Sequence, residues 1–413
     1  MLVMALNCGS ATLKYQIYDT LAENIIVQGN VEKIGLQNSS ITQKIGDDKE
    51  KQEILVSNHT EAMGVVNQFL NKAGIDIAQI KAVGHRVVQG GEKYKSSVLI
   101  DDSVVLGIED LAVLAPLHNP ANLMGIRAAR DILPDAPQVA VFDTAFHQTM
   151  PELTYRYSVP SAWYKDLGVR KYGFHGTSHL YVSKRAARML GKPARDVNMI
   201  SLHIGSGASA CAIKNGISYD TSMGMTPLCG LSMGLRVGDI DSGAVLYVME
   251  RLGKSAAEMT SILGKESGHH GLCSRSDRRD LVDGYNSDPF CKLALDIEAL
   301  NVKRYIGAYL AELGQIDAIS FTAGVGENNA FIRSQMMSGL EHFGINIDRA
   351  KNDAMGSTAV FTGVPESDIS GPDAKIKVLV IPTNEEKVII EDTIAIMNGT
   401  YNPNHLDMNY SFI

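Results

Sequence analysis

The chain of 413 residues contains little that points to a membrane or to nucleic acid. No stretch reaches the roughly 18 uninterrupted apolar residues that a membrane span requires. The formal net charge is −8, so the basic excess needed for general nucleic-acid binding is missing. Five cysteines, an odd number without metal-type spacing, indicate free thiols in a reducing compartment. These absences predict a cytoplasmic protein with neither a membrane nor a nucleic-acid partner.

Several motifs of phosphate and metal enzymes are also missing. The sequence has no GxxxxGK[ST] loop, no HExxH pair and no protein-kinase signature. The apolar start at residues 1–6 lacks a basic segment and runs into a turn, so a buried first strand is expected instead of a signal peptide. With 45% hydrophobic and 20% charged residues, the composition is that of a soluble globular protein, and the length favours two domains.

Strand and helix signals alternate along the chain, which predicts an α/β fold. A long helix is predicted over 290–313, ending at Gly314, with Leu293, Ile297 and Leu300 on one apolar face. A loosely docked tail is expected over 400–413, and a domain boundary near 147–150. The predicted strands lie at residues 2–6, 15–18, 25–32, 83–88, 138–142, 197–202, 210–213, 317–322 and 377–381.

Two short segments have the composition of a phosphate cradle. Residues 7–14 (NCGSATLK) and 203–209 (HIGSGAS) each connect two strand-like apolar runs. A turn of small residues between strands exposes backbone N–H groups and hydroxyls to one point in space. Two such turns in two similar halves predict that a nucleotide phosphate tail is held between two domains.

Two arginines lie within apolar, glycine-flanked runs near these cradles. Arg86 is part of GHRVV and Arg236 of GLRVGDID. A buried guanidinium needs an anionic partner, which could be a structural aspartate or a bound anion. The guanidinium fork suits carboxylates and phosphates, and the two nearby cradles favour the anion.

Three further segments carry candidate chemistry with a structural alternative for each. Asp143 follows a strand, where it could cap a helix or position a metal. His175 is bracketed by glycines and could donate to developing charge, or be an ordinary structural donor. Residues 324–328 (GVGEN) follow a strand and could form a backbone platform for a flat base or a tight turn.

Taken in order, eight motifs resemble the acetokinase family, within the superfamily of sugar kinases, heat-shock chaperone ATPases and actin. The resemblance covers nearly the whole chain, which makes the set far more specific than any one motif. The motifs are residues 7–14, 84–92 (GHRVVQGGE), 114–120 (LAPLHNP), 142–147 (FDTAFH), 171–179 (KYGFHGTSH), 220–227 (DTSMGMTP), 238–241 (GDID) and 382–386 (PTNEE).

The resemblance implies phosphoryl transfer between ATP and a short carboxylate, with acetate as the leading substrate and an acyl phosphate and ADP as products. It implies Mg²⁺ or Mn²⁺ as the metal, a homodimer, and two duplicated actin-like (ribonuclease H-like) α/β domains with a cleft between them. The first domain would comprise residues 1–147 and 388–413, and the second residues 148–387. Alternatives are a propionate or other short-chain acyl kinase, a pyrophosphate-dependent variant, and an ATP-driven conformational module.

Site residues follow from the same resemblance. The resemblance assigns catalytic roles to Asp143, His175 and Arg236. It assigns metal binding to Asn7 and Glu385, with Glu386 as the neighbouring possibility. Substrate contacts fall to Arg86, Val88, Leu117, Phe174 and Pro227. Nucleotide contacts fall to Lys14, His203, Ile204, Gly205, Ser206, Gly207, Asp277, Arg278, Arg279, Gly324, Val325, Gly326, Glu327 and Asn328.

Two positions depart from the family pattern within the implied nucleotide site. The family usually has asparagine at Ser206 and an aromatic residue at Arg278. Ser206 keeps a polar hydroxyl, so the change is tolerable. Arg278 could stack on a base or point into solvent. Both changes bear on the choice of phosphoryl donor.

Overall fold

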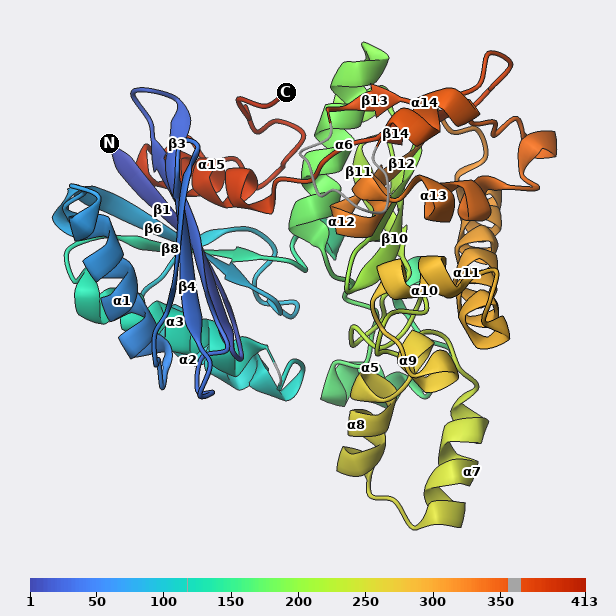
Figure 1. Ribbon diagram of the computed structural model, residues 1–413, viewed down its shortest axis with the longest axis horizontal. Helices are drawn as coiled ribbons and strands as arrows, with labels where there is room; N and C mark the ends of the chain where they lie inside the picture. The colour runs from blue at the N-terminus through green and yellow to red at the C-terminus, as the bar shows by residue number, and fades with distance from the viewer. Residues whose placement is uncertain (117, 356–364) are drawn as a thin grey trace. The chain divides into compact units, whose positions relative to one another are not determined.

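The computed structural model describes residues 1–116, 118–355 and 365–413. The chain divides into two compact units (Figure 1). Unit 1 comprises Met1–Gln148 and Asn384–Ser411, and unit 2 comprises Thr149–Thr383 and Phe412–Ile413. Each unit is a mixed α/β structure built on its own sheet. None of the helices in the described parts of the chain is long and apolar enough to cross a bilayer.

Unit 1 is built on an eight-stranded sheet with the order β5-β4-β3-β2-β1-β6-β8-β7. The predicted meander is confirmed, because β1, β2 and β3 pair antiparallel in sequence. On its other side β1 pairs parallel with β6, which pairs parallel with β8. The strands are β1 (Leu2–Gly9), β2 (Thr12–Asp19), β3 (Asn24–Glu32), β4 (Ser40–Ile45), β5 (Asp48–Glu53), β6 (Ile80–Val87), β7 (Val98–Leu99) and β8 (Gln138–Phe142).

Helices cover both faces of this sheet, and strand alternation explains how. Successive side chains of a strand point to opposite faces. Met4 and Leu6 of β1 therefore join the core beneath α1 (His59–Lys72) and α3 (Asn119–Ile132). Val3 and Ala5 join a second core with Ile389 of α15 (Glu385–Met397). Helix α2 (Asp102–Asp110) packs on α3.

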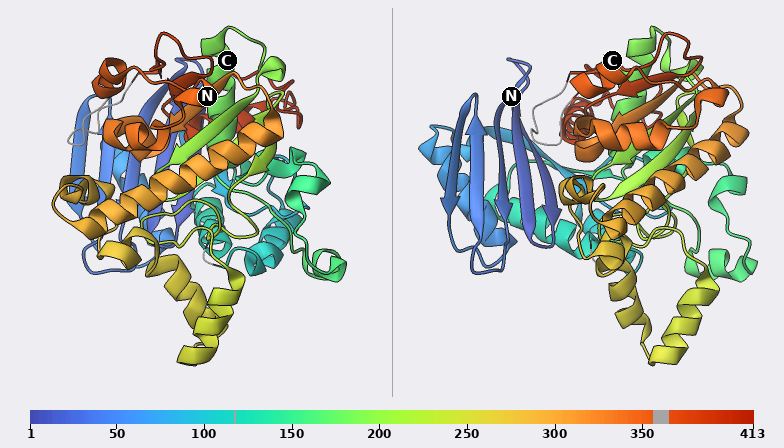
Figure 2. Two further views of the ribbon diagram at one scale, coloured as in Figure 1. Left: turned by 90° about the vertical axis from the view of Figure 1, so that its right-hand side faces the viewer. Right: turned by 45° about the vertical axis from the view of Figure 1, so that its right-hand side comes forward.

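Unit 2 has a six-stranded sheet with the order β11-β10-β9-β12-β14-β13. Its strands are β9 (Met199–Ile204), β10 (Ala208–Lys214), β11 (Ile217–Thr221), β12 (Ala318–Thr322), β13 (Ser367–Asp368) and β14 (Lys377–Val380). Its helices are α4 (Glu152–Tyr155), α5 (Ser161–Leu167), α6 (Gly176–Leu190), α7 (Ser242–Leu252), α8 (Ala256–Lys265), α9 (Gly268–Cys273), α10 (Arg278–Gly284), α11 (Pro289–Leu313), α12 (Ala323–Asn328), α13 (Ala330–Met337) and α14 (Arg349–Ala354). Helices α7 and α8 project from the body of this unit (Figure 2).

The predicted long helix is present as α11, but the first half of its predicted apolar face is not the buried one. Leu293, Ile297 and Leu300 are 47%, 36% and 49% exposed. The buried face carries Leu295 and Val302 instead, together with small residues and one glutamate. Apolar residues occur on both sides of this helix, so periodicity alone did not identify the side that packs on the core.

One alternative and one further expectation were wrong. Of the two interpretations of residues 324–328, the tight turn is excluded, because the segment is most of helix α12. The C-terminal segment is not loosely docked, because Tyr410 is buried and its hydroxyl donates to Asp392 Oδ1 at 2.9 Å. The Ser97 hydroxyl donates to Asp392 Oδ2 at 2.6 Å. Burial raises the pKa of Asp392 to about 7, against the lowering effect of these two hydroxyls.

Candidate active site

In unit 1, five predicted residues meet where strand ends adjoin the start of α15. Asn7 on β1 lies opposite Lys14 on β2 in the antiparallel register. Arg86 is on β6, and Asp143 directly follows β8 and donates its backbone N–H to Val87 O at 2.9 Å. Glu385 begins α15. Ligand sites of α/β sheets are found at such strand ends, so this is the expected place for a site.

Arg86 and Asp143 form a bidentate ion pair. Arg86 Nε donates to Asp143 Oδ1 at 3.0 Å and Arg86 Nη2 to Asp143 Oδ2 at 2.5 Å. A longer contact of 3.4 Å joins Arg86 Nη1 to Asn7 Oδ1. Burial by itself lowers the pKa of Arg86, but the carboxylates of Asp143 and Glu385 raise it more. The structural aspartate considered as the partner of Arg86 is therefore present, and it is the predicted catalytic residue.

The oxygens around Glu385 are of the kind that a hard divalent cation prefers. Burial raises the pKa of Glu385 to about 7, Arg86 lowers it, and the nearby Asp143 and Glu386 raise it. The described residues contain no cluster of three or more acidic, histidine or cysteine side chains able to hold a metal alone. Mg²⁺ usually binds through one or two carboxylates together with water and substrate phosphates, and the donor set here fits that mode.

Two asparagines that were not among the predicted site residues bind the backbone beside the predicted acyl contact Val88 in unit 1. Asn122 Oδ1 accepts the Val88 N–H at 3.0 Å, and Asn122 Nδ2 donates to Cys8 O at 2.8 Å. Asn119 Oδ1 accepts the next N–H, that of Gln89, at 3.1 Å. Asn119 is the asparagine of LAPLHNP and Asn122 follows that motif, but nothing in the sequence indicated that either would bind these backbone groups. Leu117 lies outside the described residues.

In unit 2, the second cradle is the tight turn between β9 and β10. Gly205 N donates to Gly207 O at 3.0 Å, which folds the loop on itself. His203 at the end of β9 stacks on His175, with ring centroids 4.0 Å apart and an interplanar angle of 12°. His175 Nδ1 lies 2.9 Å from Ser209 Oγ at the start of β10. Ile204 is fully buried in the core.

His175 occupies a strained position at the start of α6. Its φ of 58° is left-handed, a conformation that histidine rarely adopts. Such strain persists where the surrounding contacts determine it, and it is frequent at functional sites. The neighbouring Phe174 is buried. The glycines that bracket His175 were the sequence signal, and they allow the sharp turn that presents the imidazole.

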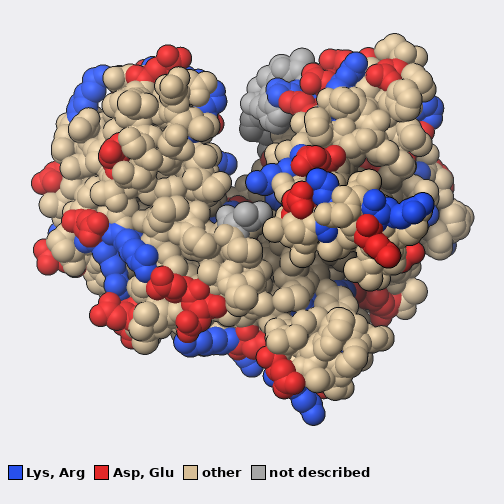
Figure 3. Space-filling model, turned by 90° about the horizontal axis from the view of Figure 1, so that it is seen from below, with Lys and Arg blue, Asp and Glu red and all other residues tan. Residues whose placement is uncertain are grey.

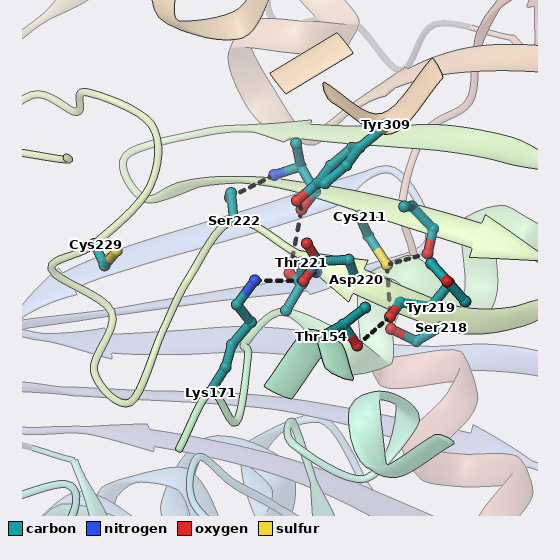
Figure 4. Close-up of polar contacts among 12 residues, drawn as sticks. Thr154, Lys171, Cys211, Ser218, Tyr219, Asp220, Thr221, Ser222, Cys229 and Tyr309 are labelled. Atoms are coloured by element: carbon teal, nitrogen blue, oxygen red, sulfur yellow. Dashed lines mark hydrogen bonds and ion pairs between the residues drawn. The ribbon is translucent and has the colours of Figure 1, made fainter. Parts of the chain in front are cut away.

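A polar cluster anchors this histidine segment to the β10–β11 hairpin (Figure 4). Lys171 forms an ion pair with Asp220 on β11, and both side chains are largely buried. The backbone N–H of Tyr172 donates to Gly224 O at 3.1 Å. Burial raises the pKa of Asp220, although Lys171 opposes this. Sequence analysis noted both motifs but did not predict that they pair.

His175 and Arg236 converge on Gly207. A Cβ atom added to Gly207 would lie 3.2 Å from His175 Nε2 and 3.5 Å from Arg236 Nη1. Arg236 Nη1 also donates to Pro227 O at 3.3 Å. The space beside Gly207 is therefore bordered by an imidazole, a guanidinium and the turn of the cradle.

We expect Gly207→Ala to weaken anion binding, because its methyl group enters the space that these two side chains face. The dissociation constant for ADP should rise by about tenfold, the equivalent of ~1.4 kcal/mol. Calorimetric titration of ADP measures this. Gly307→Ala, on α11 with open space around it and no left-handed φ, is the matched glycine control. Unchanged ADP affinity in the Gly207 variant would contradict the expectation.

A pocket of about 580 Å³ opens beside this cradle within unit 2. This volume lies in the range of small-molecule sites. Its lining includes eight predicted residues: Gly205, Ser206, Arg236, Asp277, Arg278, Arg279, Gly324 and Val325. At its edge Arg279 Nη2 pairs with Asp277 Oδ2 at 2.5 Å.

The last three residues of α12 lie outside that lining. Glu327 Oε1 accepts the Thr383 N–H at 2.9 Å, which joins the helix to the loop after β14. Gly326 O and Glu327 O accept from Nη1 of Arg333, which is fully buried. Asn328 Nδ2 donates to Gly324 O. Sequence analysis missed Arg333, whose contacts in this network are with carbonyl oxygens and one amide side chain.

Arg278 does not point into solvent, so that expectation was wrong. Only 5% of the residue is exposed. Its Nε and Nη2 donate to Glu298 Oε1 at 2.9 and 2.7 Å, and its Nη1 donates to Gly205 O at 2.8 Å. Glu298 lies on α11, twenty residues away, and was not predicted to be near the site.

The geometry can be compared with known proteins. The model of the acetokinase family matches residues 2–391. This chain belongs to the acetokinase family. An acetate kinase of Trichlorobacter lovleyi is 50% identical over 419 residues, covering 100% of this chain and 98% of that protein.

Solved structures of acetokinase relatives match the fold closely. The crystal structure of Porphyromonas gingivalis acetate kinase has a TM-score of 0.88 and 41% identity, and the match covers 96% of this chain and 99% of that one. A propionate kinase from Francisella tularensis has the same TM-score at 38% identity, with 94% and 98% covered. The two-sheet α/β architecture is therefore that of the family.

Proposed function

We propose that this member of the acetokinase family transfers a phosphoryl group reversibly between ATP and acetate, giving acetyl phosphate and ADP. The convergence of His175 and Arg236 on Gly207, beside a pocket of nucleotide size, carries the proposal. Near-complete coverage of acetate kinases at up to 50% identity supports acetate as the acceptor. The residues of units 1 and 2 would form the two actin-like domains of the family.

Unit 1 would bind the acceptor. In this proposal Asp143 holds Arg86 through Nε and Nη2, and the remaining N–H groups of the guanidinium bind the acetate carboxylate. Val88 contributes to the apolar wall for the acetate methyl group. The family resemblance assigns contacts with the same methyl group to Phe174, Pro227 and Leu117, the last of which lies outside the described residues. A carboxylate is already deprotonated, so no strong general base is needed, and Asp143 would orient Arg86 instead of removing a proton.

Unit 2 would hold the nucleotide. The phosphate tail would lie on residues 203–207, with Asp277, Arg279, Gly324 and Val325 around the adenosine. An acetate oxygen forms a bond to the γ-phosphorus, and the bond from that phosphorus to the β–γ bridging oxygen breaks, leaving its electron pair on ADP. Negative charge spreads over the transferred group, where His175 and Arg236 would donate to it.

Asn7 and Glu385, with Glu386 beside it, would hold Mg²⁺, and Lys14 opposite Asn7 would contact the phosphates. When bound, the ion supplies charge neutralisation for the phosphate oxygens. Mn²⁺ has the same preference for oxygen donors.

The direct test is acyl phosphate formation trapped with hydroxylamine, with Mg·ATP and pyrophosphate as parallel donors and acetate and propionate as parallel acceptors. We expect robust product from ATP and acetate. Product from pyrophosphate alone would show that the donor differs, and product from neither would favour an ATP-driven conformational module. The equal TM-score of a propionate kinase keeps propionate as the second acceptor, because one methylene in an apolar pocket is worth only about 1–3 kcal/mol.

We further propose that the protein is a homodimer associating through apolar residues of α7 and α11. Leu246, Tyr247 and Leu252 of α7 are 65%, 59% and 64% exposed, on a helix that projects from unit 2. Leu293 and Leu300 of α11 are also exposed, at 47% and 49%. Figure 3 views the molecule from below, the side towards which α7 and α8 project, and shows basic and acidic side chains interspersed with other residues.

Replacing both Leu246 and Leu252 with glutamate should shift the protein from dimer to monomer in sedimentation velocity. In an isologous interface the same helix of both subunits would carry the glutamates, so the dimer would have to bury unpaired charges in an apolar contact, which is costly. Leu153→Glu, at an equally exposed leucine of α4, is the control and should leave the sedimentation coefficient unchanged. A monomeric unmodified protein, or a dimer that tolerates both glutamates, would reject this interface.

A further inference from the structure

The buried ion pair between Arg278 and Glu298 has no role in the chemistry described so far. Both side chains are almost fully buried, 4% and 2% exposed, yet Arg278 lies in the lining of the proposed nucleotide pocket. The pair joins α10 to α11, two helices that pack on each other. A buried pair of this kind often adds little to stability compared with apolar residues of similar size, so its position needs another reason.

Glu298 holds the guanidinium in one orientation. Burial by itself raises the pKa of Glu298, but the charge and hydrogen bonds of Arg278, with a smaller effect of His269 when it is protonated, lower it more, so the carboxylate stays ionised. His269 Nε2 lies 3.4 Å from Glu298 Oε2, and burial lowers the pKa of His269 to about 4. Because His269 is neutral near pH 7, Arg278 supplies the positive charge that compensates this carboxylate.

The remaining contact of Arg278 is with the phosphate loop. Its Nη1 donates to Gly205 O at 2.8 Å. The described chain has no cis peptide bonds, so the N–H of Ser206 points to the opposite side of the same peptide plane. Holding the carbonyl of Gly205 against Arg278 therefore aims the Ser206 N–H away from Arg278.

Glycine makes this orientation easy to lose. A peptide flip between Gly205 and Ser206 rotates ψ of Gly205 and φ of Ser206 together, and glycine adopts the new ψ at little cost. A flipped peptide would exchange the positions of the N–H donor and the carbonyl oxygen, and the oxygen would repel an anion. Ser206 also lines the pocket.

We propose that Arg278 and Glu298 are positioning residues that lock the Gly205–Ser206 peptide with its N–H available to the nucleotide phosphates. The inference rests on the proposed function, because it requires residues 203–207 to be the phosphate loop. It assigns a role to Arg278, the position of that site at which the resemblance leads us to expect an aromatic residue.

The test compares ADP and adenosine binding by calorimetry in the full chain. Replacing both Arg278 and Glu298 with methionine removes the clamp without leaving an unpaired buried charge. We expect the dissociation constant for ADP to rise at least tenfold and that for adenosine to change less than threefold, at a nearly unchanged melting temperature. The matched control replaces Arg185 and Glu366, a bidentate pair outside the pocket lining, with methionine, and should leave both constants unchanged.

A second variant separates positioning from packing. A Cβ on Gly205 would make only ordinary contacts, the nearest at 3.4 Å, so alanine fits there and narrows the range of backbone conformations open to residue 205. Adding Gly205→Ala to the double-methionine variant should recover at least a threefold part of the lost ADP affinity. Unchanged ADP binding in the double-methionine variant, an equal loss for adenosine, or no recovery with alanine would each overturn the proposal.

Failure of the proposed function gives a different result. An unmodified chain that binds ADP but forms no acyl phosphate would reject the acyl kinase while the clamp is still measured by ADP affinity. An unmodified chain that does not bind ADP would reject the nucleotide site and the clamp together.

Discussion

The Arg236→Ala variant is expected to lose on the order of 10³-fold or more in turnover while keeping its fold. In the described part of the chain, no carboxylate pairs with Arg236; its Nη1 donates to Pro227 O at 3.3 Å and contacts Met233 Sδ at 3.8 Å. Burial lowers the pKa of Arg236. A guanidinium desolvated in this way without an anion costs stability, and its cost is offset when a phosphoryl group supplies the negative charge.

Removing Arg236 therefore leaves no unpaired charge behind and takes away only a long hydrogen bond to Pro227 O, so the melting temperature should stay the same or rise. Turnover is measured by steady-state kinetics and stability by thermal unfolding. The control for a lost positive charge is Arg304→Ala, at an exposed arginine of α11. Turnover like that of the unmodified protein in a folded Arg236→Ala variant would remove Arg236 from the mechanism. A large fall in melting temperature would instead indicate a structural role.

Local signals were sufficient for most of the fold. The strand at Gln138–Phe142 was predicted at its observed bounds, because a short apolar run bounded by polar residues has few alternatives. The opening meander was also predicted, since each strand pairs with its neighbour in sequence. Where both sides of a helix are apolar, as on α11, the sequence could not say which side faces the core. That choice depends on the packing of α9 and α10 on this helix.

The site residues also fall into two groups, those that a local motif identified and those whose role depends on a distant partner. Asn7 and Lys14 were found as one motif, and a hairpin register places them opposite each other. Arg278 was noticed as a departure, but its meaning depends on Glu298, which belongs to another helix and has no spacing that marks it. Asn122 was missed because a neutral amide on a helix carries no signal until its backbone partners are known. Residues that act through long-range partners are those that local pattern cannot identify.

The second large effect is expected for Arg86→Ala, which should lower both stability and turnover, whereas Arg236→Ala should lower turnover without lowering stability. Asp143 is 1% exposed at its side chain and receives both donors of the Arg86 fork. Arg86→Ala should therefore cost about 3–5 kcal/mol of unfolding free energy, because it leaves a buried carboxylate unpaired. It should also lower turnover on the order of 10²-fold or more through loss of a preorganised donor.

A double variant separates these two losses. Replacing Arg86 with methionine and Asp143 with asparagine removes both charges, so most of the unfolding free energy should return, as measured by the urea midpoint. Acyl phosphate formation should not return, because the guanidinium for the acetate carboxylate is still missing. If activity recovers together with stability, the ion pair serves the fold alone. If Arg86→Lys keeps both, the bidentate geometry is unnecessary, because a lysine supplies the charge without the fork.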